Sequence, residues 1–143
     1  MKYLKLDHQF VEYIPERLEA GTLYISMRYA TAVHLCCCGC GSEVVTPLTP
    51  TDWSMVFNGE NVSLHPSVGN WNLPCRSHYI INSGNVISAD PWSAKMVQST
   101  WERDRYVKAN FYGKNAQKNP APQEEVKIKK IGWLSRLGKI FHS

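Results

Sequence analysis

The sequence predicts a mainly β fold, in which a small antiparallel domain is followed by one C-terminal helix and an amphipathic tail. Residues 22–35 and 43–48 are rich in β-branched and aromatic residues, which favour strands. Two later segments each carry a hairpin turn signal in their middle. Residues 93–112, by contrast, have few turn signals and a plausible helical period. A chain of 143 residues is long enough to bury the core that such a domain needs.

The two hairpins are expected at specific turns. Residues 53–65, "WSMVFNGENVSLH", contain Asn58-Gly59, which is the strongest short-range signal for a hairpin. Residues 78–89, "HYIINSGNVISA", repeat the pattern with "SGN" at the bend. We therefore expect each segment to form two paired antiparallel strands.

The chain divides into three predicted parts. Residues 1–112 form the β domain with its late helix, which Ser93 is expected to cap at the N-terminus. Residues 113–126 are rich in proline and polar residues and are predicted to be a flexible linker. Residues 127–143 form the basic amphipathic tail.

Charge and composition limit the classes of function. The hydrophobic share of 43% and the charged share of 20% are typical of a soluble globular protein. The N-terminus has no apolar stretch of signal-peptide length, so we expect a cytoplasmic protein. The net charge is +4, but the tail alone holds five basic and no acidic residues. The rest of the chain has 11 basic and 12 acidic residues, which argues against a nucleic-acid partner.

The segment "HLCCCGCG", residues 34–41, holds four of the five cysteines in the chain. Cysteines so close together make poor disulfide partners, because a disulfide needs Cα atoms about 5.5 Å apart with converging side chains. In a reducing compartment, such a cluster indicates metal binding or catalysis. We therefore predict a metal site, with zinc as the metal.

Tetrahedral zinc is usually held by two close pairs of ligands from distant parts of a chain. Cys75 and His78, in "CRSH", supply a second pair that the intervening hairpin can bring to the cluster. A catalytic zinc usually has three ligands, mostly histidine and carboxylate, so this cysteine-rich set predicts a closed structural site. An iron–sulfur cluster is the main rival. The first pair stays open among Cys37 with Cys40, Cys36 with Cys38, and Cys38 with Cys40.

The segment "HPSVGNW", residues 65–71, resembles an active-site loop. Ser67 precedes Val-Gly, where backbone amides could form an oxyanion hole. A nucleophilic serine needs a base within hydrogen-bond reach, and His78 or His65 could supply it. His78 serves this role only if it is not a zinc ligand. The alternative is a tight turn in which Asn70 and its neighbouring tryptophan close an edge of the core.

The tail has apolar residues at helical spacing and basic residues mainly off that stripe. A basic amphipathic helix with a tryptophan suits an anionic membrane surface, which would make the protein peripheral to a membrane. The alternative is a helix that docks on its own domain or on a partner subunit. The apolar stripe consists of Ile128, Ile131, Leu134, Leu137 and Phe141.

Three motifs together resemble a bacterial family of unknown function. Its pattern is C-x-C-G-C-G, then P-S-x-G-N-W, then C-R-S-H-Y-x-I, and the resemblance covers roughly residues 22–90. Such proteins resemble components found beside bacterial ubiquitin-like conjugation genes, which implies a role in attaching or removing a small protein modifier. The resemblance implies that the partner is a ubiquitin-like modifier or its conjugation enzymes. The metal-ligand candidates that it carries over are Cys36, Cys38, Cys40, Cys75 and His78.

Cys37 departs from this family pattern, which puts the Cys37–Cys40 pair in doubt. His34 is expected at a strand end or as a support for the ligands. Two functions then stand: a zinc-binding module that binds the modifier or a partner, and a deubiquitinase-like serine peptidase that removes the modifier. Ser67→Ala should keep the fold under both functions but abolish cleavage of the modifier only under the second.

Overall fold

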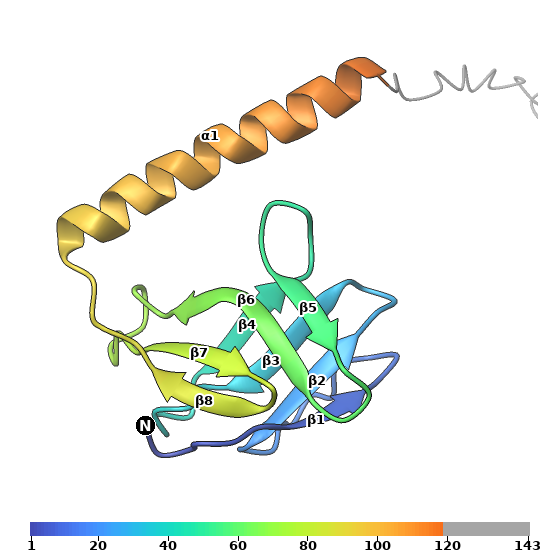
Figure 1. Ribbon diagram of the computed structural model, residues 1–143, viewed down its shortest axis with the longest axis vertical. Coiled ribbons are helices and arrows are strands. Elements are labelled where there is room, and N and C mark those ends of the chain that lie inside the picture. Colours follow the sequence, from blue (N-terminus) through green and yellow to red (C-terminus); the bar gives the residue numbers. More distant parts are fainter. Residues whose placement is uncertain (119–143) are drawn as a thin grey trace, which may run out of the picture.

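The computed structural model describes residues 1–118 as two four-stranded sheets followed by one long helix (Figure 1). The strands of each sheet lie side by side in sequence order, β1 to β4 and β5 to β8. This architecture confirms the predicted mainly β fold with a C-terminal helix. The strands are β1 (Asp7–Phe10), β2 (Thr22–Ser26), β3 (Thr31–Leu35), β4 (Glu43–Pro47), β5 (Ser54–Phe57), β6 (Val62–Gly69), β7 (His78–Asn82) and β8 (Asn85–Ser88).

Both predicted hairpins are present, and their turn residues explain them. In the β5–β6 turn, Gly59 has a φ of +97°, and the side-chain oxygen of Asn58 accepts a hydrogen bond from the backbone N–H of Asn61 (2.8 Å). In the β7–β8 turn, Ser83 and Gly84 both have positive φ (49° and 77°). Two consecutive positive φ values match the right-handed twist of the strands, as in a type I′ turn.

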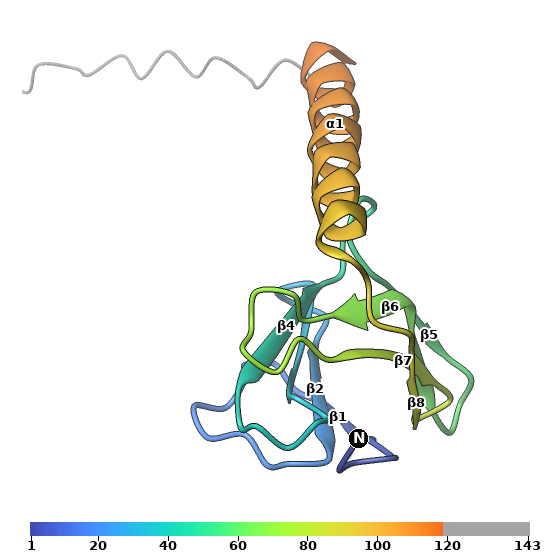
Figure 2. The same ribbon diagram turned by 90° about the vertical axis from the view of Figure 1, so that its left-hand side faces the viewer.

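The two sheets share one hydrophobic core, and Figure 2 shows them facing each other across it. Alternate residues of the strands point inward, since successive side chains of a strand lie on opposite faces. The fully buried aromatic residue Tyr79 lies in this core, and its hydroxyl is 2.7 Å from Nε2 of buried His34. The largest buried aliphatic side chains are Leu23, Ile25, Leu64 and Ile81.

Two features of the first sheet differ from simple antiparallel strands. β1 pairs with β2 in parallel, and its mostly exposed side chains leave no alternating apolar pattern to read. The segment 22–35 is two strands, because a turn follows Ser26 and Ala30 has a φ of 47°. The hydroxyl of Ser26 accepts the N–H of Tyr29 (3.3 Å) and stabilises this turn.

Helix α1 (Ala94–Lys118) begins where the sequence predicts and ends six residues later than expected. The hydroxyl of Ser93 accepts the N–H of Met96 (3.2 Å), so Ser93 caps the helix as predicted. The first residues of the predicted linker are therefore helical. They include lysine, alanine and glutamine, which favour helices, and no proline before position 120. The rest of the linker and the predicted tail helix, 127–143, lie outside the described residues.

Helix α1 contacts the β domain. Val97 is buried, and Nζ of Lys108 lies 2.6 Å from Oδ1 of Asp52 in the loop before β5. Partial burial acts to raise the pKa of Asp52, but the hydrogen bonds from Lys108 and Thr49, together with the charge of Lys108, outweigh burial and lower the pKa. Within residues 1–118, no helix is long and apolar enough to span a membrane.

Candidate metal centre and serine–histidine pair

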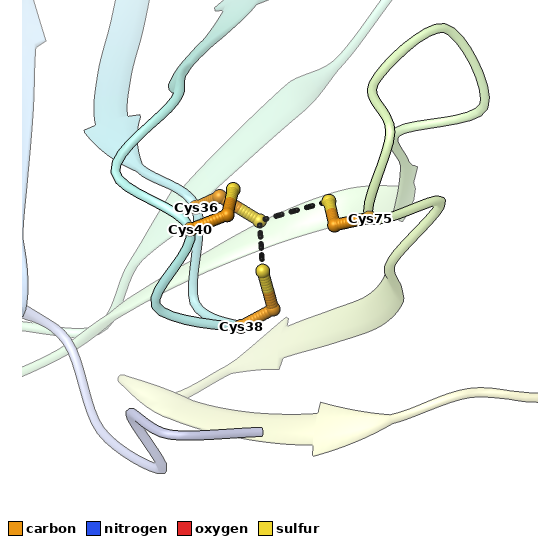
Figure 3. A group of neighbouring side chains, drawn as sticks. All are labelled: Cys36, Cys38, Cys40 and Cys75. Carbon is orange, nitrogen blue, oxygen red and sulfur yellow. Dashed lines mark hydrogen bonds between the residues drawn. The ribbon is translucent and has the colours of Figure 1, made fainter.

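Four cysteine side chains converge between the two sheets (Figure 3). Cys36, Cys38 and Cys40 lie in the turn between β3 and β4, and Cys75 lies just before β7. Their Sγ atoms are all within 4.8 Å of one another. The Sγ atom of Cys36 is 3.4 Å from that of Cys38 and 3.8 Å from that of Cys75.

These distances fit a tetrahedral metal site. Four sulfurs that each lie about 2.3 Å from a zinc ion are about 3.8 Å apart from one another. A disulfide would need a separation of about 2.05 Å, so these sulfurs are not bonded in pairs. Four thiolates also match the preference of zinc for soft ligands and leave no open position for water.

The turn that carries three of these cysteines depends on its glycines. Gly39 and Gly41 have φ values of 91° and 81°, which side chains rarely tolerate. The N–H of Cys36 donates to the carbonyl of Ser42 (2.8 Å) and closes the turn at the end of the β3–β4 ladder. A Cβ at Gly39 would lie 2.6 Å from the side chain of Lys2, so this position also lacks space.

Cys37 lies outside the sulfur group that Cys36, Cys38, Cys40 and Cys75 form. Its side chain is fully buried in the hydrophobic core, and burial raises the pKa of its thiol to about 12. A thiol in such surroundings behaves as a small apolar side chain. The geometry therefore does not use the Cys37–Cys40 pair that the spacing alone had left open.

Two thiols of the sulfur group have shifted pKa values. Hydrogen bonds with Ser42 chiefly lower the pKa of Cys40 to about 6. Burial, followed by hydrogen bonds among the thiols, raises the pKa of Cys38 to about 12. A divalent metal would replace these protons, because only thiolates bind it.

His78 lies outside the sulfur group as well, and it contacts Ser67. The Oγ atom of Ser67 is 2.8 Å from Nε2 of His78. The other ring nitrogen, Nδ1, is 2.6 Å from the backbone carbonyl oxygen of Asp90. A carbonyl only accepts, so Nδ1 carries the proton and Nε2 accepts the hydrogen bond from the Ser67 hydroxyl.

The strand register explains how these two side chains meet. Val68 pairs with Tyr79, and Gly69 pairs with His78, on neighbouring antiparallel strands. Ser67 and Gly69 are two residues apart, so they face the same side of the sheet as His78. A register shift between Leu64 and Val68 bends β6 next to Ser67, and such bulges often re-aim a side chain beside a site.

Aromatic side chains enclose the imidazole. The ring centroids of Trp71 and Trp92 lie 5.0 and 5.1 Å from that of His78, which is 8% exposed. The indole of Trp71 fills the space beside Gly69, where a Cβ would lie 2.5 Å from Nε1. A hollow of about 210 Å³ opens over Ser67 and these rings. Its far wall is formed by α1 through Thr100, Trp101, Arg103 and Asp104.

A buried polar network joins the sulfur group to the serine–histidine pair. Ser77 is the residue before His78, and its Oγ atom is 3.1 Å from Sγ of Cys36. The same Oγ atom accepts a hydrogen bond from the side-chain N–H of Asn70 (2.9 Å). The N–H of Asn70 also donates to the carbonyl of Ser77 (2.8 Å). The contacts with Cys36 and Asn70 therefore hold Ser77 in place, and with it the chain segment that carries His78.

The remaining candidate histidines lie elsewhere. His65 is exposed and pairs with Ser54 of β5. His34 is fully buried, and desolvation lowers its pKa to about 4. No local pattern in the sequence indicates Asp90, which contributes a backbone oxygen, or Ser77, because both act through the tertiary fold.

Comparison with known proteins identifies a family for this chain. No curated protein and no solved structure matches the chain. One family, described as bacterial ubiquitination-like system serine protease (BubE), matches residues 10–89. This match covers more than half of the chain and includes the four clustered cysteines, Ser67 and His78. The chain therefore belongs to the BubE family of a bacterial ubiquitination-like system.

Proposed function

We propose that this protein is a serine peptidase that removes a ubiquitin-like modifier, with Ser67 as the nucleophile and His78 as the general base. The observation that carries the proposal is the 2.8 Å contact between Oγ of Ser67 and Nε2 of His78. The contact between Nδ1 and the Asp90 carbonyl orients the imidazole, as a third group does in serine hydrolases. The family description, which names a serine protease, supports the same role.

The proposed reaction is an acyl transfer. His78 Nε2 takes the proton from Ser67 Oγ as this oxygen bonds to the carbonyl carbon at the modifier's C-terminus. The backbone N–H of Ser67 would help to stabilise the oxyanion. The imidazolium then gives its proton to the leaving amine or alcohol, and an acyl-serine remains. Water, deprotonated by the same nitrogen, hydrolyses this ester and frees Ser67.

We further propose that the metal is zinc and that its role is structural. Cys36, Cys38, Cys40 and Cys75 would hold it, and His78 stays free to act as the base. When bound, the ion would cross-link the β3–β4 turn to the segment before β7. Because Ser77 contacts Sγ of Cys36 and precedes His78, this cross-link would also fix the position of the imidazole. A binding module without catalysis, the other function open from the sequence, would have no need of the serine–histidine contact.

The proposal predicts that a fluorophosphonate reacts with Ser67. Intact mass and peptide mapping would show one phosphonyl group per chain on the peptide that contains this serine. Labelling should abolish cleavage of a conjugate made with the modifier encoded beside this protein. Labelling at another residue, or full cleavage by the labelled protein, would contradict the serine mechanism and favour the binding module.

For the tail, we propose reversible binding to an anionic membrane surface. Each lysine or arginine near an anionic leaflet contributes about 1 kcal/mol, and the apolar stripe adds burial at the headgroups. Full-length protein should co-sediment with anionic vesicles, less so in high salt, whereas a truncation after Glu125 should not. Equal sedimentation of the two proteins, or of full-length protein with neutral vesicles, would count against the anchor.

A further inference from the structure

Two strand edges near the serine–histidine pair have no strand partner among the described residues. β4 is the last strand of the first sheet, and on its outer side the carbonyl of Pro47 accepts the N–H of Trp53 (3.0 Å), while no strand pairs with the residues before Pro47. β5 begins at Ser54, which pairs with His65, so the last residues of β6 extend beyond it. β4 and this end of β6 lie near each other in both views (Figures 1 and 2).

The register shows which backbone groups of β4 face outward. The N–H of Cys36 donates to Ser42, and the N–H of Leu48 donates to Ala30. In an antiparallel ladder, hydrogen-bonded pairs alternate along the strands. Val44 and Thr46 thus bond to β3, whereas the backbone N–H and C=O of Val45 point away from it.

The same reasoning applies to the end of β6. The N–H of Asn70 donates to the carbonyl of Ser77, which makes these two residues a hydrogen-bonded pair. Gly69 and His78 are then a pair without hydrogen bonds to each other. The N–H and C=O of Gly69 therefore face the open side of β6, two residues from the nucleophile.

A groove of about 380 Å³ lies between these two edges. Val45 of β4 and Gly69 of β6 both line it, and so does Trp53. Trp53 and Gly69 also line the hollow over Ser67, so the groove and the hollow adjoin at these two residues. A molecule that fills the groove needs hydrogen-bond donors and acceptors facing both β4 and β6, and it must reach Ser67. An extended polypeptide has both properties.

We propose that the groove binds the modifier's C-terminal residues as an added strand, which hydrogen-bonds to Gly69 of β6 and to Val45 of β4. This inference rests on the proposed peptidase function and names how its substrate is held. The added strand places the terminal carbonyl carbon at Ser67. Recognition comes from main-chain hydrogen bonds, while pockets beside the strand select side chains.

Val45→Pro tests the β4 wall, because proline removes the outward N–H and leaves the β3 ladder intact. The strand already accepts proline at Pro47, the next outward position. The matched control is Val45→Ala, which keeps the N–H, at a side chain that is 54% exposed. The substrate is a peptide of the modifier's C-terminal residues ending in an aminocoumarin. We expect Val45→Pro to lower kcat/KM about tenfold and Val45→Ala to change it less than about twofold.

The small ester nitrophenyl acetate separates this inference from the peptidase proposal. It needs the serine–histidine pair but not the groove, so Val45→Pro should lower kcat/KM for the peptide more than for the ester, whereas misfolding would lower both alike. If the native protein acts on neither substrate, the peptidase proposal is wrong. If Val45→Pro cleaves the peptide normally, the inference is wrong while the peptidase proposal stands.

A scan of N-methylated peptides tests the added strand independently of any protein variant. Methylation removes one substrate N–H at a time, and both sides of an added strand bond to the groove. Every methylated residue within the groove should therefore lower kcat/KM, and residues beyond it should tolerate the methyl group. Uniform tolerance along the peptide would overturn the proposal.

Discussion

Replacing Ser67 or His78 with alanine is expected to lower kcat for modifier cleavage by a factor on the order of 10³–10⁴. In the proposed mechanism Ser67 supplies the bond-forming oxygen, and His78, whose Nε2 lies 2.8 Å from that oxygen, is the base. The double variant should be little slower than either single variant, since two groups that act as a unit lose their effect together. Steady-state kinetics on the modifier conjugate would measure all three.

His65→Ala is the matched control for the histidine. His65 also lies near Ser67 in the sequence, but it is exposed, and β6 carries it beside Ser54 of β5. Its replacement should leave kcat within about twofold. If instead His65→Ala is inactive and His78→Ala is active, the assignment of the base is wrong. Circular dichroism should show that each variant keeps the native fold.

Removing the proposed zinc ion is expected to unfold the protein. Structural zinc sites contribute on the order of 10 kcal/mol to folding. Removing the ion with a chelator, or one of its ligands by Cys36→Ser, should therefore abolish the cooperative unfolding transition that the native protein shows on heating. Cys36 is fully buried and contacts both Cys38 and Cys75, so its loss opens the centre of the group. Elemental analysis should find one zinc per native chain and none in Cys36→Ser.

Cys37→Ala provides the control from the adjacent position. Its thiol is equally buried but lies in the apolar core outside the sulfur group. The variant should keep one zinc per chain and lose only about 1 kcal/mol, the cost of a small cavity. Loss of zinc from Cys37→Ala with retention in Cys36→Ser would reverse the ligand assignment. Iron with visible absorption in the native protein would contradict zinc.

The sequence by itself determined the features that depend on neighbouring residues. Asn58-Gly59 and the "SGN" segment specify the two hairpins, because their turns need residues that tolerate positive φ. Ser93 specifies the start of α1 through its own hydroxyl. The crowding of cysteines in residues 36–40 indicated a metal site, and Ser67 was singled out by its local segment.

Only the tertiary structure decided between candidates that the spacing left equal. Cys36, Cys38 and Cys40 meet Cys75 because the two sheets face each other, while the adjacent Cys37 turns into the core. The register of β6 and β7 brings His78 to Ser67 and not to the sulfurs. Pairing between strands is set by packing across the whole core. For that reason, neither the base, its backbone partner at Asp90, nor the open edge at Gly69 could be read from local sequence.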